Sequence, residues 1–337
     1  EIHWRDWSSD VCSSDLKFAD DDIWFLGDHA VHFDGRWFTQ YSVPLGESLK
    51  FTDSVTSPDG EIWAAESQAL YHFDGTAWNT VPLGQPYQVL SVWRSPTGTI
   101  WLGAKDGIIL RSNGTTWGQV PCPVAEHVTS IWGTNDSTIW ATTSVGKILR
   151  WDGAQWSVVH NGNSTFVRIR GVSETNVRAV ATNGGHRQWN GVNWSAFLAN
   201  QLYDIWSPSS DKQCVVGADH LGDGRMSCWE NNAWSTVLPN TSKPIDTMTG
   251  LSDDRRVFTD TGGTIITATP QSGWTQSTEL SDIGPTFIFS GGWHRAADET
   301  WMVSGSIVGY HDGVDWHPTQ NLNTQAYLRM EGLGDTG

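Results

Sequence analysis

Apolar and polar residues alternate along this chain in short runs, and each run ends at Gly, Pro, Asn or Asp. In one representative stretch, strand-like runs rich in Val, Ile, Thr and Trp occupy residues 89–93, 99–103, 108–111 and 116–120. β-Branched and aromatic residues favour strands, and the intervening residues favour turns. No segment keeps an apolar period of 3.6 residues, so the pattern predicts strands and no helix.

This unit recurs along the whole chain. It ends in Asp/Asn-Gly-x-x-Trp or a close variant, at Trp37, Trp78, Trp117, Trp156, Trp194, Trp234, Trp274 and Trp316. A period of about forty residues with four strands is typical of a propeller blade. The repeats therefore predict an all-β fold, a β-propeller of eight four-stranded blades. Seven blades or an open ring are the alternatives.

The two ends of the repeat region complement each other. Residues 22–27 have the pattern of a second strand, and residues 325–331 that of a first strand with no successor. We expect these segments to pair in one sheet, which would close the ring and cover its open edges. A fragment of a longer parent protein with more repeats would have similar ends, so both interpretations stay open.

Residues 6–16, Asp-Trp-Ser-Ser-Asp-Val-Cys-Ser-Ser-Asp-Leu, resemble a translated sequencing adapter. We therefore expect residues 1–16 to be an artefact of a metagenomic gene fragment, without regular structure and packed against nothing. A polar, disordered N-terminal tail is the alternative. Residues 17–337 are expected to form a single propeller domain.

Residues 131–141, Ile-Trp-Gly-Thr-Asn-Asp-Ser-Thr-Ile-Trp-Ala, followed by the strand pair at 146–156, resemble repeats of secreted bacterial propellers of the YVTN/BNR-like superfamily. Residues 57–63, Ser-Pro-Asp-Gly-Glu-Ile-Trp, are also similar to propeller repeats of sensor histidine kinases. The resemblance covers residues 22–332 and implies an extracellular, cell-surface or periplasmic protein. The sialidase Asp-box has a different spacing, and the sialidase arginine set cannot be mapped onto this chain.

The composition excludes some classes of binding partner for this chain. The formal net charge of −17 argues against nucleic acid, because binding phosphates needs a basic surface. The sequence has no apolar run long enough for a membrane span. The 22 Trp residues are expected mainly to fill the interfaces between blades, with equivalent second-strand positions at Trp24, Trp63, Trp101, Trp140 and Trp301. We expect a monomer.

Motifs for catalysis are missing from the sequence: it has no phosphate-binding loop, nucleophile elbow or zinc-peptidase helix. We therefore expect a non-enzymatic module that binds protein or glycan, without a cofactor. The alternatives are a carbohydrate-active hydrolase or lyase with paired carboxylates at the channel mouth, and a sensor or assembly-factor propeller cut from a longer protein.

Ligand contact is expected on the face that bears the second-to-third-strand loops, because these loops differ among repeats while the opposite Asp-Gly turns stay alike. The candidate contact residues on this face and at the channel mouth are Asp28, His29, Tyr87, Glu126, His127, His160, Tyr203, Asp204, Asp219 and His220. Ordinary loop surface is the alternative for each. Further charges are expected along the channel, at Arg94, Arg168, Arg170, Asp246, Arg329 and Glu331.

Two smaller constellations complete the candidate chemistry. Asp219, His220 and Asp223 share one enlarged loop and form the best local candidate for a cation site, and calcium at the Asp-Gly turns is a weaker one. Cys214 and Cys228 lie symmetrically about residue 221, so we expect them to face each other across a hairpin. A disulfide, which would suit an exported protein, and two small buried thiols are both compatible with that position.

Overall fold

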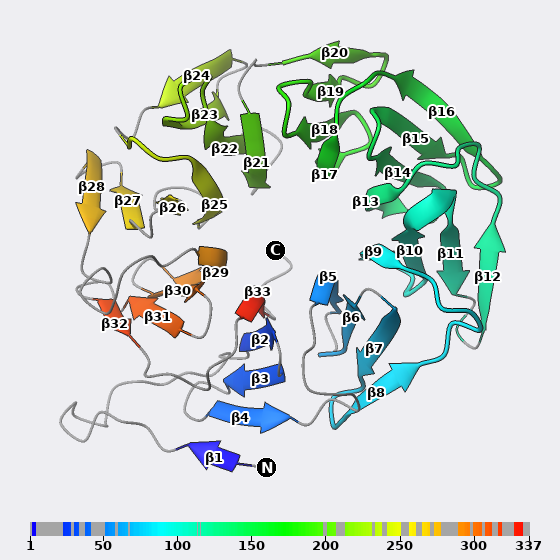
Figure 1. Ribbon diagram of the computed structural model, residues 1–337, viewed down its shortest axis with the longest axis horizontal. Helices are drawn as coiled ribbons and strands as arrows, with labels where there is room; N and C mark the ends of the chain where they lie inside the picture. The colour runs from blue at the N-terminus through cyan, green and yellow to red at the C-terminus, as the bar shows by residue number, and fades with distance from the viewer. Residues whose placement is uncertain are drawn as a thin grey trace.

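The computed structural model describes residues 2–4, 23–27, 30–33, 38–41, 51–57, 60–66, 68–112, 114, 116–197, 201–206, 213–230, 233–237, 241–250, 256–260, 265–269, 273–277, 289–296, 299–304, 307–311, 316–318 and 327–332. Side chains are described mainly between residues 51 and 245. Within these residues the strands form antiparallel sheets, seven with four strands and one with five. Figure 1 shows the sheets following one another in a ring.

The first strand of each sheet lies toward the centre of the ring and contacts the first strands of the two neighbouring sheets (Figure 1). Numbered from sheet 1 to sheet 8, these strands are β33 (Tyr327–Gly332), β5 (Phe51–Thr56), β9 (Val89–Arg94), β13 (Val128–Asn135), β17 (Phe166–Ser173), β21 (Gln201–Trp206), β25 (Ile245–Gly250) and β29 (Phe289–Ala296).

The second and third strands form the middle of each sheet. In the same order, the second strands are β2 (Ile23–Gly27), β6 (Ile62–Glu66), β10 (Ile100–Ala104), β14 (Thr138–Thr143), β18 (Asn176–Ala181), β22 (Gln213–Ala218), β26 (Arg256–Asp260) and β30 (Glu299–Ser304). The third strands are β3 (Ala30–Phe33), β7 (Ala69–Phe73), β11 (Ile109–Ser112), β15 (Lys147–Trp151), β19 (Arg187–Trp189), β23 (Gly224–Glu230), β27 (Ile265–Thr269) and β31 (Ile307–His311).

The fourth strands lie on the rim of the ring (Figure 1). They are β4 (Phe38–Tyr41), β8 (Trp78–Val81), β12 (Trp117–Val120), β16 (Trp156–Asn161), β20 (Trp194–Ala196), β24 (Ala233–Val237), β28 (Gly273–Ser277) and β32 (Trp316–Pro318). The predicted strands at 89–120 are confirmed to within about one residue at each end. Where the sequence predicts only a turn, residues 105–107 form a single turn of 3-10 helix, η1 (Lys105–Gly107).

Sheet 1 is made from both ends of the chain. β33 pairs with β2 in antiparallel register, with Met330 opposite Phe25, and the sequence predicted a pairing of these two segments. A fifth strand, β1 (Ile2–Trp4), pairs with the outer edge of β4. The expectation that residues 1–16 lack regular structure is therefore wrong at residues 2–4. The physical reason is that the outer edge of β4 presents unpaired backbone groups, which an extended Ile-His-Trp segment can satisfy. Residues 5–16 lie outside the described part of the chain.

The apolar core lies between neighbouring sheets. The Trp101 ring of sheet 3 packs against Trp151 and Trp156 of sheet 4, with ring centroids 5.2 and 5.9 Å apart. Trp140 of sheet 4 meets Trp189 and Trp194 of sheet 5 in the same way, at 5.3 and 5.4 Å. The predicted interface role of the second-strand Trp residues is thus confirmed there.

Trp63 also packs against the next sheet, where its ring centroid lies 6.4 Å from that of Trp117. The side chains of Trp24 and Trp301 lie outside the described residues. In sheet 5 the equivalent second-strand position is occupied by Arg178 instead of Trp. Its buried guanidinium lies 5.0 Å from the ring centroid of Trp234 in sheet 6, and burial lowers the pKa of Arg178 to about 10. A cation–π contact there takes the place of the aromatic pair.

Polar contacts join the first strands near the centre of the ring. Buried Asp53 of β5 accepts a hydrogen bond from the backbone N–H of Val92 in β9, at 2.9 Å. Ser130 of β13 accepts one from Ile169 of β17, at 3.2 Å. These bonds satisfy buried backbone donors that would otherwise be unpaired where two sheets meet.

The cysteine pair lies in the same cross-strand row as the interface residues. Cys214 of β22 is directly opposite Cys228 of β23, their Cα atoms are 4.1 Å apart, and they form a disulfide. Sheets 2, 3 and 4 have Trp63 opposite His72, Trp101 opposite Arg111 and Trp140 opposite Arg150 in this row. Of the two states left open by the sequence, the structure has the bridged one.

Removing the disulfide should destabilise the fold. The double variant Cys214→Ser/Cys228→Ser should lose about 3 kcal/mol of unfolding free energy, the value for a cross-link that closes a loop of about 15 residues. Urea unfolding measures this loss, and Cys122→Ser, which removes a half-buried free thiol, is the matched control. Thiol titration of the denatured, unreduced chain should find two of the four cysteines. Four reactive thiols would contradict the bridge.

Candidate functional site

The turns between second and third strands share one face of the ring with the connections between sheets. We call this the connection face. Backbone hydrogen bonds of 3.0 to 3.2 Å tie the turns to the connections, from Lys105 N to Gln88 O, from Ser144 N to His127 O, from Thr182 N to Thr165 O and from Gly224 N to Thr241 O. The second-to-third-strand turns of sheets 3 to 6 are therefore held in place by the neighbouring connections.

Each first strand carries a β-bulge beside the connection face, at its second residue or, in β21, at its third. The register slips at Thr52, Leu90, Thr129, Val167, Tyr203, Asp246, Ser290 and Leu328. A bulge re-aims a side chain and is common next to binding sites. Thr52 and Val167 are exposed, and Leu90, Thr129 and Tyr203 are half-buried. The eight positions, which we call the bulge ring, surround the centre at the connection face. Of them, sequence reasoning named only Tyr203 as a ligand contact.

Two candidates on the connection between sheets 3 and 4 have partners. Glu126 forms an ion pair with Lys147 at the start of β15, and this hydrogen bond holds the pKa of Glu126 below its ordinary value. The Nδ1 atom of His127 accepts a hydrogen bond from the backbone N–H of Asp106, at 3.2 Å. Both side chains thus fasten the connection to neighbouring turns, which is a structural role.

The other candidates are distributed around the connection face. Tyr87 packs against the apolar cluster between sheets 2 and 3. The Tyr203 hydroxyl donates to the side-chain oxygen of Gln201, at 2.8 Å. His160 is half-buried near the end of β16, with its ring 6.4 Å from that of Phe166. Asp28 and His29 lie outside the described residues, as does the side chain of Asp204.

The proposed cation loop does not hold a metal-ligand set. Asp219 Oδ1 accepts hydrogen bonds from the backbone N–H groups of Leu221 and Asp223, and Oδ2 pairs with Arg225. His220 is exposed. Within the described residues no group of three or more His, Cys, Asp or Glu side chains is placed to hold a metal ion. The expectation is wrong because the turn itself and Arg225 occupy the carboxylate of Asp219.

The opposite face, here the turn face, carries the Asp-Gly turns. Asp74 accepts hydrogen bonds of 2.9 Å from the backbone of Thr76 and Ala77, and with the Thr76 hydroxyl these hold the pKa of Asp74 at about 2. Asp152 accepts equivalent bonds from Ala154 and Gln155. These local bonds give the Asp side chains of the two turns a structural role.

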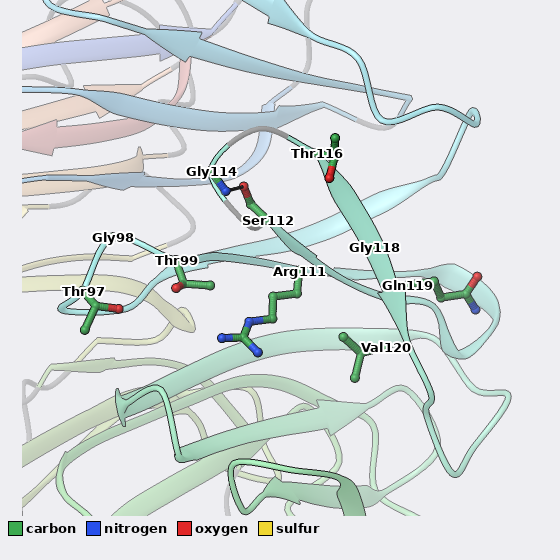
Figure 2. Close-up of a pocket in the computed structure, with 10 residues that line it drawn as sticks. All are labelled: Thr97, Gly98, Thr99, Arg111, Ser112, Gly114, Thr116, Gly118, Gln119 and Val120. Carbon is green, nitrogen blue, oxygen red and sulfur yellow. Dashed lines mark hydrogen bonds between the residues drawn. The ribbon is translucent and has the colours of Figure 1, made fainter.

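A cavity that sequence reasoning missed lies at the rim of sheet 3, near the turn face. Its volume is about 560 Å³, and Figure 2 shows Arg111 extending into it from β11. The other lining residues are mostly small and polar: Thr97, Gly98, Thr99, Ser112, Gly114, Thr116, Gly118, Gln119 and Val120. A signal exists in the repeats, because Gly118 follows the terminal Trp where other repeats have Asn79, Ser157, Ser195 or Ser235.

Among the described residues, no helix is long and apolar enough to cross a membrane. Neither a protein-family model nor a curated protein sequence matches the chain. Solved structures with a similar fold include YCF48 bound to D1 peptide, 18% identical, with a TM-score of 0.54 over 74% of this chain and 88% of that one. YCF48 from Cyanidioschyzon merolae is 14% identical, with a TM-score of 0.57 over 80% and 95% of the two chains. The C-terminal WD40 domain of Sif2 is 13% identical, with a TM-score of 0.59 over 84% and 86%. These likenesses, with the sheets described above, indicate a β-propeller repeat protein.

The half-buried His160 should make stability depend on pH. Burial lowers the pKa of His160 below its ordinary value of 6.5, and the charge of Arg187 lowers it further. The unfolded chain therefore binds this proton more readily, so its contribution to stability is complete above pH 6.5 and falls as the pH drops through the folded pKa.

We expect His160→Gln to lose less unfolding free energy than the wild type between about pH 7.5 and pH 5, as measured by urea unfolding. His220→Gln, which changes an exposed histidine, should keep the wild-type acid dependence. Equal pH slopes for His160→Gln and the wild type would contradict the inference.

Proposed function

We propose that this chain is an eight-bladed β-propeller that acts as a non-enzymatic binding module for protein segments. The observation that carries the proposal is the connection face. Its turns differ in sequence from repeat to repeat, yet in sheets 3 to 6 backbone hydrogen bonds fix them to the connections. A rigid surface that differs around the ring can recognise an asymmetric partner with little ordering cost on binding.

The bulge ring supplies suitable contact chemistry at the centre of this face. Leu90, Val167 and Tyr203 contribute apolar or aromatic surface. The Thr52 and Thr129 hydroxyls donate to backbone carbonyls of neighbouring strands and so help to fix the ring. Exposed apolar side chains also occur on two turns of this face, Val145 and Leu221, which are 48% and 72% exposed. Apolar anchors with nearby polar groups are typical of protein recognition. The solved complex of YCF48 with a D1 peptide supports a peptide ligand for a propeller of this kind.

The eight-blade count and closure of the ring are part of the proposal. The pairing of β33 with β2 supports closure, and so do the contacts that β33 makes with β29 and β5. Closure of this type joins both chain ends in one sheet and covers the edge of β2 that would otherwise be unpaired.

Export from a bacterial cell and a monomeric state complete the proposal. The Cys214–Cys228 disulfide supports an oxidising location, because such bonds are rare in reducing compartments. The resemblance of the repeats to secreted propellers of the YVTN/BNR-like superfamily points the same way. Glycan ligands and a carboxylate-based hydrolase remain outcomes that the following experiment distinguishes.

Peptide and glycan arrays probed with the purified chain test the function. We expect peptide binding that falls about tenfold in Tyr203→Ala, the usual loss for an aromatic anchor. Val192→Ser, which changes a residue 79% exposed on the turn face, is the control and should bind as the wild type does.

Turnover assays on the same glycans form the second arm of this experiment. No hydrolysis or elimination is expected. Glycan turnover that is lost in Asp204→Asn or Glu331→Gln would show that the chain is an enzyme and would contradict the proposed binding module. Binding that is lost equally in the Tyr203 and Val192 variants would contradict the assignment to the connection face.

A further inference from the structure

The cavity of sheet 3 lies beside the cross-strand row of residues that, in the other sheets, packs against the neighbouring sheet. Trp101 of β10, Arg111 of β11 and Gly118 of β12 are directly opposite one another in this row. The Arg111 guanidinium carbon lies 5.2 Å from the centroid of the Trp101 ring. Sheet 4 has the corresponding row Trp140, Arg150 and Ser157, with Arg150 at 5.3 Å from the Trp140 ring. The two rows differ at the rim, where sheet 3 has no side chain.

The missing side chain leaves open space next to a cation. A Cβ atom placed at Gly118 would meet no atom within 4 Å. Within the part of the chain that the structure describes, Arg111 makes no hydrogen bond or ion pair. Burial raises the pKa of Asp136, whereas hydrogen bonds and the charge of Arg111 lower it overall. Its Oδ2 accepts from the Thr97 hydroxyl, and its buried Oδ1 has no hydrogen-bond partner among the described residues, Arg111 included. The planar guanidinium fork, which suits a carboxylate, therefore faces a cavity with its donors unused.

Residues of β12 line the same cavity. β12 is the outermost strand of sheet 3, so one side of it has no partner strand among the described residues. The equivalent edge in sheet 1 is occupied, because β1 pairs with β4. The row there runs from Trp24 through His32 and Thr39 to His3. An extended segment can thus add a residue to the outer end of this row.

We propose that the rim of sheet 3 takes up an extended peptide as a fifth strand, with a Glu or Asp opposite Gly118 whose carboxylate binds Arg111. Neighbouring strands lie about 4.8 Å apart, so the added residue would be about 10 Å from the Arg111 backbone. An arginine and a glutamate side chain together span this distance once the guanidinium turns outward from Trp101. Gly118 places no side chain in the path between them.

The ligand is a peptide with a single acidic residue and not an acidic tract. The formal net charge of −17 repels acidic chains at long range. At physiological salt that repulsion is screened over about 8 Å, which leaves a local contact with Arg111 effective. This site is at the rim near the turn face, so it is separate from the bulge ring and goes beyond the proposed function.

The test uses the acetylated and amidated peptide Thr-Val-Glu-Val-Thr and its counterpart with Gln at the centre. Binding to the full chain is measured by calorimetry, and the backbone amide signal of Gly118 is followed by NMR. We expect the Glu peptide to bind about tenfold more tightly than the Gln peptide, as for one charge-assisted hydrogen-bonded pair. It should also shift the Gly118 signal.

Variants in the rows of sheets 3 and 4 test whether Arg111 and Gly118 cause the preference for the Glu peptide. Arg111→Gln should abolish the preference for Glu, and Gly118→Ser should weaken binding of the Glu peptide by filling the path. Arg150→Gln removes the matching stacked cation of sheet 4 and should leave the preference unchanged. Equal binding of the two peptides, or an equal effect of Arg150→Gln and Arg111→Gln, would overturn the proposal. Tyr203→Ala should not affect this peptide, so failure at the bulge ring and failure at the rim are distinguishable.

Discussion

The contact on which the structure depends is the insertion of a second-strand side chain between the third- and fourth-strand aromatics of the next sheet. Trp101 against Trp151 and Trp156 is the clearest instance. A twisted four-stranded sheet has two faces, and each must be covered by a neighbour to bury enough apolar surface. Large aromatic side chains bridge the wide gap between sheets near the rim, which explains the tryptophans at these positions in the described sheets.

Because burial takes place between sheets, the loops contribute little to the apolar core and can vary in sequence. The structure shows that they are nevertheless fixed, since turns and connections share backbone hydrogen bonds such as that from Ser144 N to His127 O. Several residues that the sequence offers as ligand contacts instead stabilise the turns and connections. Glu126 and Asp219 each pair with a basic side chain, so both carboxylates already have a partner.

The interface row also shows how one repeat position acquires different chemistry. It holds a stacked Trp and Arg in sheets 3 and 4, a cation between aromatics in sheet 5 and a disulfide in sheet 6. Each solution fills the same space between two sheets with a different interaction. In sheet 3 the outer end of the row is Gly118, which has no side chain. Arg111, whose counterpart in sheet 4 supports packing, therefore borders a cavity.

The sequence by itself determined the repeat period, the strands of each repeat and the facing positions of Cys214 and Cys228. These features depend on alternation and on hairpin register, which are local and extend over a few tens of residues. The bulge ring could not be read from the sequence, because one extra residue in a strand only interrupts the alternation. Tertiary structure alone decided the partner of Glu126, the pairing of β1 with β4, and the cavity at Arg111. Each of these depends on which side chains meet after the sheets have packed, and a repeat pattern fixes the position of a residue in its strand but not the neighbour that it meets.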